Sequence, residues 1–368
     1  MGQDNQLRLS LEQTVARKGT GFFFGEAVRS AIRVDNDLVF VSDAPLTHDQ
    51  AVRMVLEYLP QERFKIFEQE RELDYSFGIP GVGRFRANLF YQRGSIGCAI
   101  RTLPHEVMSF AQLGFPENVA ESVLSKPSGL ILVTGPTGCG KTTTLAAMIE
   151  YLNQHEAYHI VTIEDPIEYV YTNKRSMINQ REVGSDTRSF STALKHALRQ
   201  DPDVILVGEM RDIESMEIAL LAAETGHLIF ATLHTPDASQ SIHRIVHAFP
   251  SQQQNQVRLQ LSFVLQGVIA QQLASRIGGG RTLVTEILLA TPAVRNIIRD
   301  DRMHQIYSTM QMDQRDGMRT FNMSLDELVR KGTIAREEAL SRSMDVLELE
   351  RALNLQKIAK PKAGLFKR

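Results

Sequence analysis

The sequence predicts an α/β protein built from two domains, and three observations lead to that prediction. The chain has 368 residues and a mass of 41.4 kDa, more than one typical domain needs. From residue 116 onward, continuous apolar runs alternate with helical stretches, the pattern of a parallel sheet covered on both faces. Residues 1–102 differ, because short helical and strand-like segments alternate there.

Composition and charge exclude several classes of protein. Apolar residues make up 43% of the chain and charged residues 23%, ordinary values for a globular protein. The 41 basic and 43 acidic side chains give a formal charge of −2, which argues against a generic polyanion binder, and we expect no nucleic-acid partner. The two cysteines, Cys98 and Cys139, exclude a disulfide scaffold and favour a reducing cytosol. The longest apolar runs are strand-sized and the N-terminus has no signal core, so we expect membrane contact only through partners.

The first domain is expected over residues 1–102. Residues 38–41 read as a strand, and Thr47 is a plausible N-cap for a helix over 49–58. A turn with proline and glycine at 79–83 separates two strand-like runs, 73–77 and 84–90, which is a hairpin signal. Residues 103–115 have few strong patterns and are interpreted as a linker.

The second domain is expected to have its core over residues 116–290, followed by a helical part over 291–356. In that core the predicted strands and helices alternate along the chain: strand 130–134, helix 142–153, strand 160–163, helix 189–199, strand 204–207, helix 213–224 and strand 228–233. The chain after about residue 252 is expected to be mostly helical. The basic residues 357–368 are expected to be a solvated tail; a membrane or partner contact is the alternative.

The segment from residue 135 to 142 fits the pattern G-x-x-x-x-G-K-[ST]. It follows an apolar strand and opens a helix, as phosphate binding requires, because the glycines let successive N–H groups face one anion at a helix N-terminus. Lys141 would reach the β- and γ-phosphates of a nucleoside triphosphate, and the Thr142 hydroxyl would ligate Mg²⁺. Cys139 is expected to be a small side chain beside a crowded backbone, with redox control as the alternative. The predicted nucleotide-binding residues are Gly135, Pro136, Thr137, Gly138, Cys139, Gly140, Lys141, Thr142 and Thr143.

Acidic residues follow two of the predicted strands. Glu209 comes at the carboxyl end of strand 204–207, where ligands lie in open α/β sheets, and it is a candidate to orient or deprotonate the attacking water. An aspartate usually supports Mg²⁺ at such a strand end, but here Gly208 precedes the glutamate, so part of the metal support must come from elsewhere. The cluster that ends strand 160–163 is the obvious supplier, although helix-cap or turn roles remain open for its members Glu164, Asp165 and Glu168.

Histidines and arginines complete the candidate site. His227 and His234 lie at the two ends of strand 228–233, where a polar group could sense the γ-phosphate; a structural role is the alternative. His243 and His247 are spaced i, i+4, but no acidic partner follows at helical spacing, so we expect no metal there. Three arginines, Arg84, Arg86 and Arg101, flank strand-like segments; they belong either to a salt-bridged sheet edge or to a site that reaches phosphate across an interface.

These residues together resemble the PilT-type ATPases of type IV pilus machines, within the wider family of secretion and pilus-assembly ATPases. The resemblance runs from about Ile32 over nearly all of the chain. The motifs that carry it are residues 83–86, 101–104, 135–142, 162–168, 201–212 and 226–235, together with 293–300, which looks like the C-terminal motif of retraction ATPases.

The resemblance implies a PAS-like N-terminal α+β domain and a RecA-like P-loop ATPase domain with a helical C-terminal extension. It implies a homohexamer that hydrolyses ATP with Mg²⁺ and retracts the pilus from the cytoplasmic side of the inner membrane. The implied partners are an inner-membrane platform protein and the pilin machinery, with other pilus ATPases as further candidates. It further implies that Glu209 is the catalytic glutamate, that Glu164 lies near the metal, and that His234 lies in the nucleotide site. At least one of Arg84, Arg86 and Arg101 would act on ATP across a subunit interface.

One segment departs from the family pattern. Residues 19–28 contain three consecutive phenylalanines, Phe22, Phe23 and Phe24, which we interpret as a buried strand; an exposed partner surface is the alternative. This departure leaves an accessory paralogue or secretion-type ATPase open beside the retraction motor and, together with Gly208, a nucleotide-gated adaptor that does not hydrolyse ATP. The fold would also permit a RecA-like nucleic-acid motor, but the charge balance argues against it.

Overall fold

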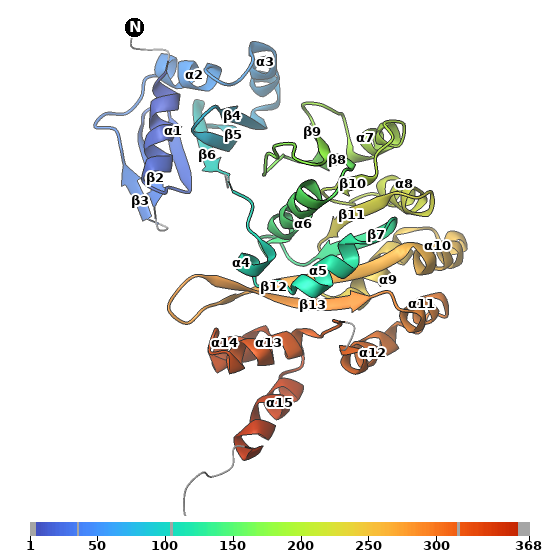
Figure 1. The fold of residues 1–368 in the computed structure, drawn as a ribbon. Coiled ribbons are helices and arrows are strands. Elements are labelled where there is room, and N and C mark those ends of the chain that lie inside the picture. The colour runs from blue at the N-terminus through green and yellow to red at the C-terminus, as the bar shows by residue number, and fades with distance from the viewer. Residues whose placement is uncertain (1–4, 35–36, 104–105, 315–316, 360–368) are drawn as a thin grey trace, which may run out of the picture. The chain divides into compact units, whose positions relative to one another are not determined.

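The computed structural model describes residues 5–34, 37–103, 106–314 and 317–359. The chain divides into two compact units (Figure 1). The first consists of residues 1–107 together with 166–170, and the second of residues 108–165 and 171–368. Within the described residues, no helix is long and apolar enough to cross a bilayer.

The first unit is a sheet of six antiparallel strands in the order β3-β2-β1-β6-β5-β4, with helices against one face. The buried core lies between that face and the helices, and includes Leu7 and Leu11 from α1, Met54 from α2 and Phe67 from α3. The elements are β1 (Gly21–Gly25), β2 (Val28–Val34), β3 (Asp37–Phe40), β4 (Glu72–Ile79), β5 (Gly83–Gln92), β6 (Ser95–Thr102), α1 (Gln6–Ala16), α2 (His48–Leu56) and α3 (Gln61–Glu70).

Local signals position several of these elements. Thr47 caps α2 as predicted, because its side chain accepts the N–H of Gln50 while the Gln50 side chain accepts the N–H of Thr47. Such a reciprocal cap satisfies two donors that a helix leaves unpaired. The predicted hairpin is confirmed as β4 and β5, with Ile79 paired to Gly83 at the turn. The sequence reading missed α1, whose leucines alternate at Leu7, Leu9 and Leu11, a spacing more typical of a strand than of a helix.

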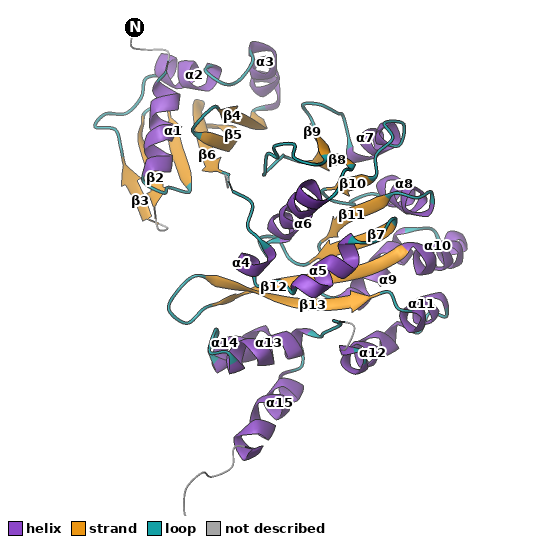
Figure 2. Ribbon diagram, viewed as in Figure 1, coloured by secondary structure: helices purple, strands orange, loops and turns teal. Residues whose placement is uncertain are grey.

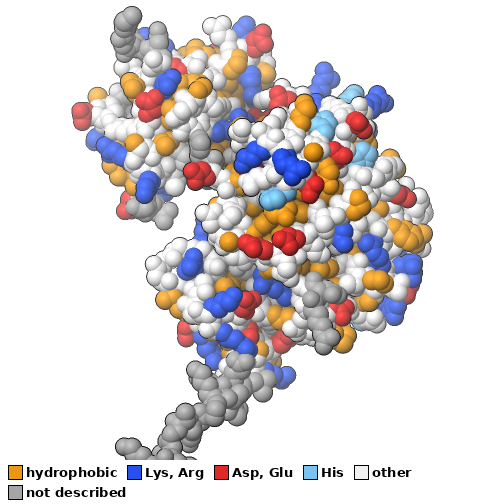
Figure 3. All heavy atoms as spheres, in the orientation of Figure 1, with side chains coloured by type: hydrophobic (Ala, Val, Ile, Leu, Met, Phe, Trp, Pro, Cys, Tyr) orange, Lys and Arg blue, Asp and Glu red, His pale blue; other side chains and the backbone are white. Residues whose placement is uncertain are grey.

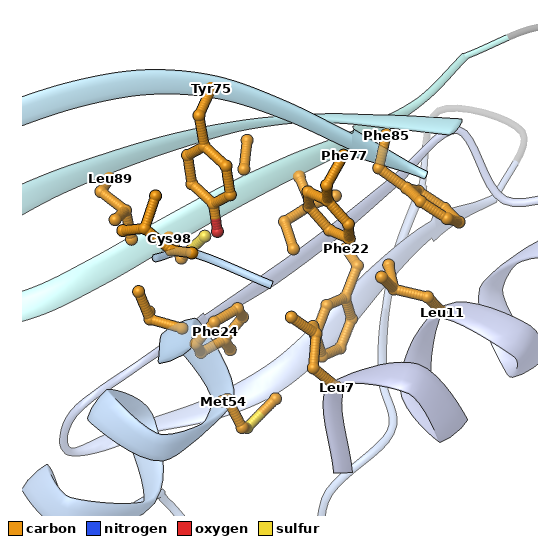
Figure 4. Close-up of a cluster of buried hydrophobic side chains, with 14 of the residues drawn as sticks. Leu7, Leu11, Phe22, Phe24, Met54, Tyr75, Phe77, Phe85, Leu89 and Cys98 are labelled. Atoms are coloured by element: carbon orange, nitrogen blue, oxygen red, sulfur yellow. The ribbon is translucent and has the colours of Figure 1, made fainter. Parts of the chain in front are cut away.

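The three phenylalanines form strand β1, as predicted. Phe22 and Phe24 point into the core (Figure 4), where their side chains are 0% and 4% exposed. Phe23 faces the other way and is half-buried, with the guanidinium of Arg33 lying 5.4 Å from the centre of its ring. The segment is therefore a strand with two buried aromatic side chains and one partly covered ring.

The second unit contains a seven-stranded sheet in the order β13-β12-β7-β11-β10-β8-β9. All neighbouring strands are parallel except β12 and β13, which are antiparallel. The predicted strands and helices over residues 130–233 are confirmed, and helices flank the sheet (Figure 2). Those elements are β7 (Gly129–Thr134), α6 (Lys141–His155), β8 (His159–Glu164), β9 (Met177–Glu182), α7 (Phe190–Ala197), β10 (Val204–Val207), α8 (Ile213–Glu224) and β11 (Leu228–Leu233).

The prediction that the chain is mostly helical after residue 252 is wrong for part of that region. After α9 (Ala238–Ala248) and α10 (Ser251–Val264), the chain forms two long strands, β12 (Leu265–Ser275) and β13 (Arg281–Leu289). The signal was present as the triplet Gly278, Gly279 and Gly280, all of which adopt positive φ in the turn. Because β12 pairs with β7, the hairpin extends the sheet beside the strand that leads to the phosphate loop.

Further helices complete the second unit. Residues 103–115, interpreted as a linker, include the four-residue helix α4 (Phe110–Leu113), and Pro104 lies outside the described residues. Of the basic tail, residues 357–359 belong to the last helix and residues 360–368 lie outside the described part. The remaining elements are α5 (Glu117–Leu124), α11 (Pro292–Arg299), η1 (Met303–Gln305), α12 (Ile306–Met312), α13 (Phe321–Arg330), α14 (Arg336–Arg342) and α15 (Val346–Ala359).

Candidate nucleotide site

The glycine-rich loop lies between the buried strand β7 and the N-terminus of α6. Gly135, Gly138 and Gly140 all have positive φ, a conformation that glycine adopts without steric cost. Gly135 also has no room for a side chain, because a Cβ there would lie 2.4 Å from the carbonyl oxygen of Gln271 on β12. The backbone N–H groups at the start of α6 and the dipole of that helix make this loop an anion-binding site.

Lys141 is the first residue of α6, and its ammonium group lies against the loop. Its Nζ donates to the carbonyl oxygens of Gly135 at 2.7 Å and Pro136 at 3.2 Å. Burial lowers the pKa of Lys141, and electrostatic interactions with Cys139 and Glu209 oppose that shift. The two carbonyl contacts hold the cation at the loop, where it can attract phosphate oxygens.

Cys139 is 4% exposed within the same loop. Burial raises the pKa of its thiol, an effect that the nearby Lys141 opposes. Since oxidation and metal binding require the thiolate, this environment supports the prediction of a packed side chain over that of a redox switch.

Glu209 lies just beyond the end of β10 and is bonded through both carboxylate oxygens. Oε1 is 3.1 Å from Nε2 of His234, and Oε2 accepts from Nε of Arg211 at 2.7 Å. The other ring nitrogen of His234, Nδ1, lies 3.4 Å from the hydroxyl of Thr137 in the phosphate loop. The ends of β10 and β11 thus bring a carboxylate, an imidazole and the phosphate loop together at one edge of the sheet.

Glu164 ends β8, the strand beside β10, and is 6% exposed. Its Oε1 accepts from the hydroxyl of Thr162 at 2.6 Å and from the side-chain amide of Gln180 on β9 at 3.2 Å. These donors fix the orientation of a buried carboxylate whose strand ends at the same edge as the phosphate loop. Asp165, the next residue, is exposed.

Gly208 occupies the position where an aspartate was expected, and the packing explains the glycine. A Cβ on Gly208 would lie 3.0 Å from the carbonyl oxygen of Ile163 and 3.5 Å from the ring of Phe190. The backbone of Gly208 is also bonded on both sides. Its N–H donates to the carbonyl oxygen of Ile163, and its carbonyl oxygen accepts from the hydroxyl of Thr232. The first carboxylate after β10 is therefore Glu209.

The histidines have different environments. His227 contacts the carbonyl oxygen of Ala222 through Nδ1 at 3.0 Å. This contact joins His227 to the end of α8 and supports a structural role for it rather than a role as γ-phosphate sensor. His243 and His247 stack with ring centroids 3.8 Å apart on α9. Across the part of the chain that the structure describes, no cluster of three or more His, Cys, Asp or Glu side chains could hold a metal ion.

The three arginines belong to the first unit, on the face of β5 and β6 that points away from its core. Arg86 and Arg101 are directly paired across the two strands, and Arg86 also lies 3.9 Å from Asp74. Arg84 donates to the Ser76 hydroxyl at 2.8 Å and to the carbonyl oxygen of Ile167 at 2.9 Å, in the segment that packs with this unit. Two like charges directly opposite on neighbouring strands disfavour the sheet, and the carboxylate of Asp74 partly offsets that repulsion, as the salt-bridged sheet edge predicts.

Sequence reasoning missed several polar partners of the site. Arg211 lies in the motif over residues 201–212 and was given no role, although a cation two residues after the candidate carboxylate Glu209 was a usable signal. Gln180 was missed because β9 was not predicted. Thr137 was included only as part of the phosphate loop.

Comparison with known proteins places the chain in a family. The family described as type II/IV secretion system proteins matches residues 96–279, and the type IV pilus retraction ATPase PilT of Pseudomonas aeruginosa is 50% identical over 308 residues, covering 84% of this chain and 89% of that protein. The chain belongs to this secretion-protein family. The type IV pilus ATPase PilU of the same organism is 38% identical, covering 94% of this chain and 90% of that protein.

Comparison with solved structures leads to the same family. The crystal structure of the pilus retraction motor PilT with bound ADP is 49% identical and covers 94% of this chain and 99% of that one, with a TM-score of 0.88. The predicted fold class is thereby confirmed, with an N-terminal domain followed by an ATPase domain. As a member of the secretion-protein family with an intact phosphate loop, the chain is a P-loop ATPase that binds adenine nucleotide.

Proposed function

We propose that this chain is the motor that retracts type IV pili, working in the cytoplasm as a ring of six copies at the inner-membrane base of the pilus. The observation that carries the proposal is the similarity to the retraction motor PilT, at 49% identity over 94% of this chain. The partners are then the platform protein and the pilin machinery. On the face drawn in Figure 3, basic and acidic side chains are interspersed, an arrangement better suited to protein partners than to nucleic acid.

In the proposed reaction the phosphate loop holds ATP and Lys141 attracts its β- and γ-phosphates. Glu209 accepts a proton from the attacking water as the new oxygen–phosphorus bond forms and the bond to the β–γ bridging oxygen breaks. Both oxygens of Glu209 have a partner, His234 on one and Arg211 on the other, and each oxygen keeps a second acceptor site for water. His234 also contacts Thr137 in the phosphate loop, which makes it a candidate sensor of the γ-phosphate.

The residues at the sheet edge fit a magnesium ion bound together with ATP. Thr142 is the second residue of α6 and carries a hydroxyl beside the phosphate loop, and Glu164 presents a buried, oriented carboxylate at the end of β8. Oxygen ligands of this kind suit Mg²⁺, which commonly keeps several waters and binds through few protein groups. The ion would neutralise charge on the β- and γ-phosphates.

The arginines of the first unit are proposed to act on ATP bound by a neighbouring subunit. Arg86 and Arg101 are paired like charges on a surface away from the core, and a phosphate would relieve their repulsion. Arg84 is the weaker candidate, because its guanidinium is engaged with Ser76 and Ile167.

An accessory role beside a second retraction ATPase is the alternative function. The 38% identity to PilU supports this reading less than the 50% identity to PilT supports the principal motor. The deciding experiment counts surface pili on cells that lack this gene and on cells that carry only the Lys141→Ala form. Excess pili with lost surface motility in both strains is the expected result. Bald cells would mean an extension motor, and unchanged piliation would mean an accessory or secretion role.

A further inference from the structure

Glu286 is a carboxylate on β13 that is only 3% exposed. It pairs with Ala270 on β12, and Ala270 pairs in turn with Thr134 on β7. Thr134 is the residue immediately before the phosphate loop. The three residues therefore lie in one row across the sheet, two strands from the start of the loop.

Two helices begin at this carboxylate. The N–H of Ala238, the first residue of α9, donates to Oε1 of Glu286 at 2.9 Å. The backbone of Phe321, the first residue of α13, also favours the charged form of Glu286 and so lowers its pKa. Helix N-termini stabilise a negative charge through their free N–H groups and their dipoles. Burial nevertheless raises the pKa of Glu286 to about 7, and the charge of Asp237 acts in the same direction.

The start of α9 is connected to the nucleotide site. His234 lies four residues before Ala238, and the hydroxyl of Thr235 lies 2.6 Å from that of Ser241 on α9. Ser241, which is fully buried, also bonds to the hydroxyl of Thr134 at 3.2 Å. The loop that carries His234 is thus fixed at two points, to Thr134 through Ser241 and to β13 through Glu286.

The start of α13 is fixed to the same strand. Arg319 exchanges backbone bonds with Ile287, and its Nε donates to the hydroxyl of Thr285 at 2.9 Å. The N–H of Thr285 donates to Ser324 on α13 at 3.2 Å. Thr285, Glu286 and Ile287 therefore join α13 to the sheet, and only Glu286 among these three also bonds to α9.

We propose that Glu286 is a positioning residue that couples the loop carrying His234 to the C-terminal helices, so that nucleotide binding at one end changes the order of α13 at the other. The proposal rests on the role given to His234 above. The charged form of Glu286 stabilises both helix N-termini, whereas the neutral form has fewer acceptor sites for their N–H groups.

The first test compares Glu286→Gln with Glu337→Gln, which makes the same change of charge at an exposed position on α14. Glutamine keeps one acceptor oxygen for one of the two N–H groups. We expect kcat for ATP to fall about tenfold in Glu286→Gln, with KM within about twofold because the phosphate loop is unchanged. Glu337→Gln should match the wild type.

The second readout is the ratio of the wild-type kcat to the kcat of Glu286→Gln. If Glu286 only filled space in the core, this ratio would not change with pH. Asp237 from α9 and Tyr307 from α12 also interact electrostatically with Glu286, while β12 and α13 contribute Ala270 and the backbone of Phe321. Groups that titrate in both proteins cancel in the ratio. The ratio should therefore be larger at pH 8, where Glu286 is charged, than at pH 6. An equal ratio at both pH values would overturn the proposal.

Hydrogen exchange tests the coupling directly in the wild-type chain. A non-hydrolysable ATP analogue, which carries the γ-phosphate, should slow exchange of the amides at residues 321–325 as well as in the phosphate loop, and Glu286→Gln should lose only the first effect. No change at residues 321–325 in the wild type would refute the coupling, even if the variant fails to fold. Because this arm needs nucleotide binding and not ATP turnover, it remains decisive if the proposed retraction function fails.

Discussion

Nε2 of His234 lies 3.1 Å from Oε1 of Glu209, across the ends of two neighbouring parallel strands. The same imidazole lies within 3.4 Å of the Thr137 hydroxyl in the phosphate loop. A single side chain therefore contacts both the loop that binds phosphate and the carboxylate proposed to act on water. Movement of the loop around a nucleotide would be transmitted to Glu209 through this histidine.

Replacing Glu209 with glutamine should separate binding from hydrolysis. The amide keeps the shape of the side chain but cannot accept the proton of the attacking water, so phosphate release should fall by about 10²–10⁴-fold. Binding of a fluorescent ATP analogue should change little, because the phosphate loop is intact. Glu214→Gln, at a largely exposed residue in the first turn of α8 that pairs with Lys195, is the control. Wild-type turnover in Glu209→Gln would remove this residue from the mechanism.

Replacing Arg101 with glutamine should stabilise the first unit while reducing turnover. The change removes a like-charge pair with Arg86, which is worth about 0.2–1 kcal/mol of unfolding free energy. If the arginine acts on ATP of a neighbouring subunit, ATPase activity of the assembled protein should fall at the same time. Scanning calorimetry and phosphate release measure the two effects. Lys65→Gln, an exposed change on α3, should alter neither, and full activity in Arg101→Gln would leave Arg86 as the candidate.

The stability of the chain should depend on the ionisation of Glu286. Burial is the main cause that raises the pKa of this carboxyl from its ordinary 4.5 to about 7, so the folded state binds the proton more tightly than the unfolded state does. The resulting stabilisation is fully present below about pH 4.5 and is lost as the pH rises to about 7. In that window the unfolding free energy of the wild type should fall relative to Glu286→Gln, by up to about 1.4 kcal/mol per pH unit. Urea titrations from pH 5 to 8 measure the difference, and parallel curves would contradict it.

Alanine substitutions at adjacent phenylalanines of β1 should lower the stability of the chain by very different amounts. Phe22 is fully buried, so Phe22→Ala should cost about 3–5 kcal/mol of unfolding free energy through lost burial and a cavity. Phe23 is half-buried and stacks on Arg33, so Phe23→Ala should cost about 1 kcal/mol. Calorimetry of the two variants tests the contrast. A larger loss for Phe23→Ala would mean that this ring is buried by a partner.

Much of the fold followed from local sequence signals. The strands that end at Thr134, Glu164, Val207 and Leu233 are continuous apolar runs bounded by glycine, acidic or histidine residues, so their order and the position of the phosphate loop could be predicted. The β12–β13 hairpin could not be separated from helix by periodicity, because its strands are buried on both faces over most of their length. Such continuous burial removes the alternation that marks a strand, and the glycine triplet was the signal to use.

The site could be predicted only in part, because strand ends reveal which residues are near an edge but not which atoms touch. Glu209, Glu164 and His234 were named from their positions at strand ends. The contacts of Glu209 with Arg211 and of Glu164 with Gln180 depend on side-chain directions and on a strand that the sequence did not reveal. Glu286 was missed for a related reason, since its importance comes from two helices that begin 35 residues after it and 48 residues before it in the chain.

The close packing around Gly208 limits how this site can change. A Cβ at that position would lie 3.0 Å from the carbonyl oxygen of Ile163, so this oxygen, next to Glu164 in the chain, would have to shift by a few tenths of an ångström. We therefore expect the aspartate that many other P-loop enzymes carry at this point to disturb the position of Glu164 rather than strengthen the site. Engineering that transplants catalytic residues from distant ATPases should leave this position as glycine, and searches for such enzymes that demand an aspartate here will overlook proteins like this one.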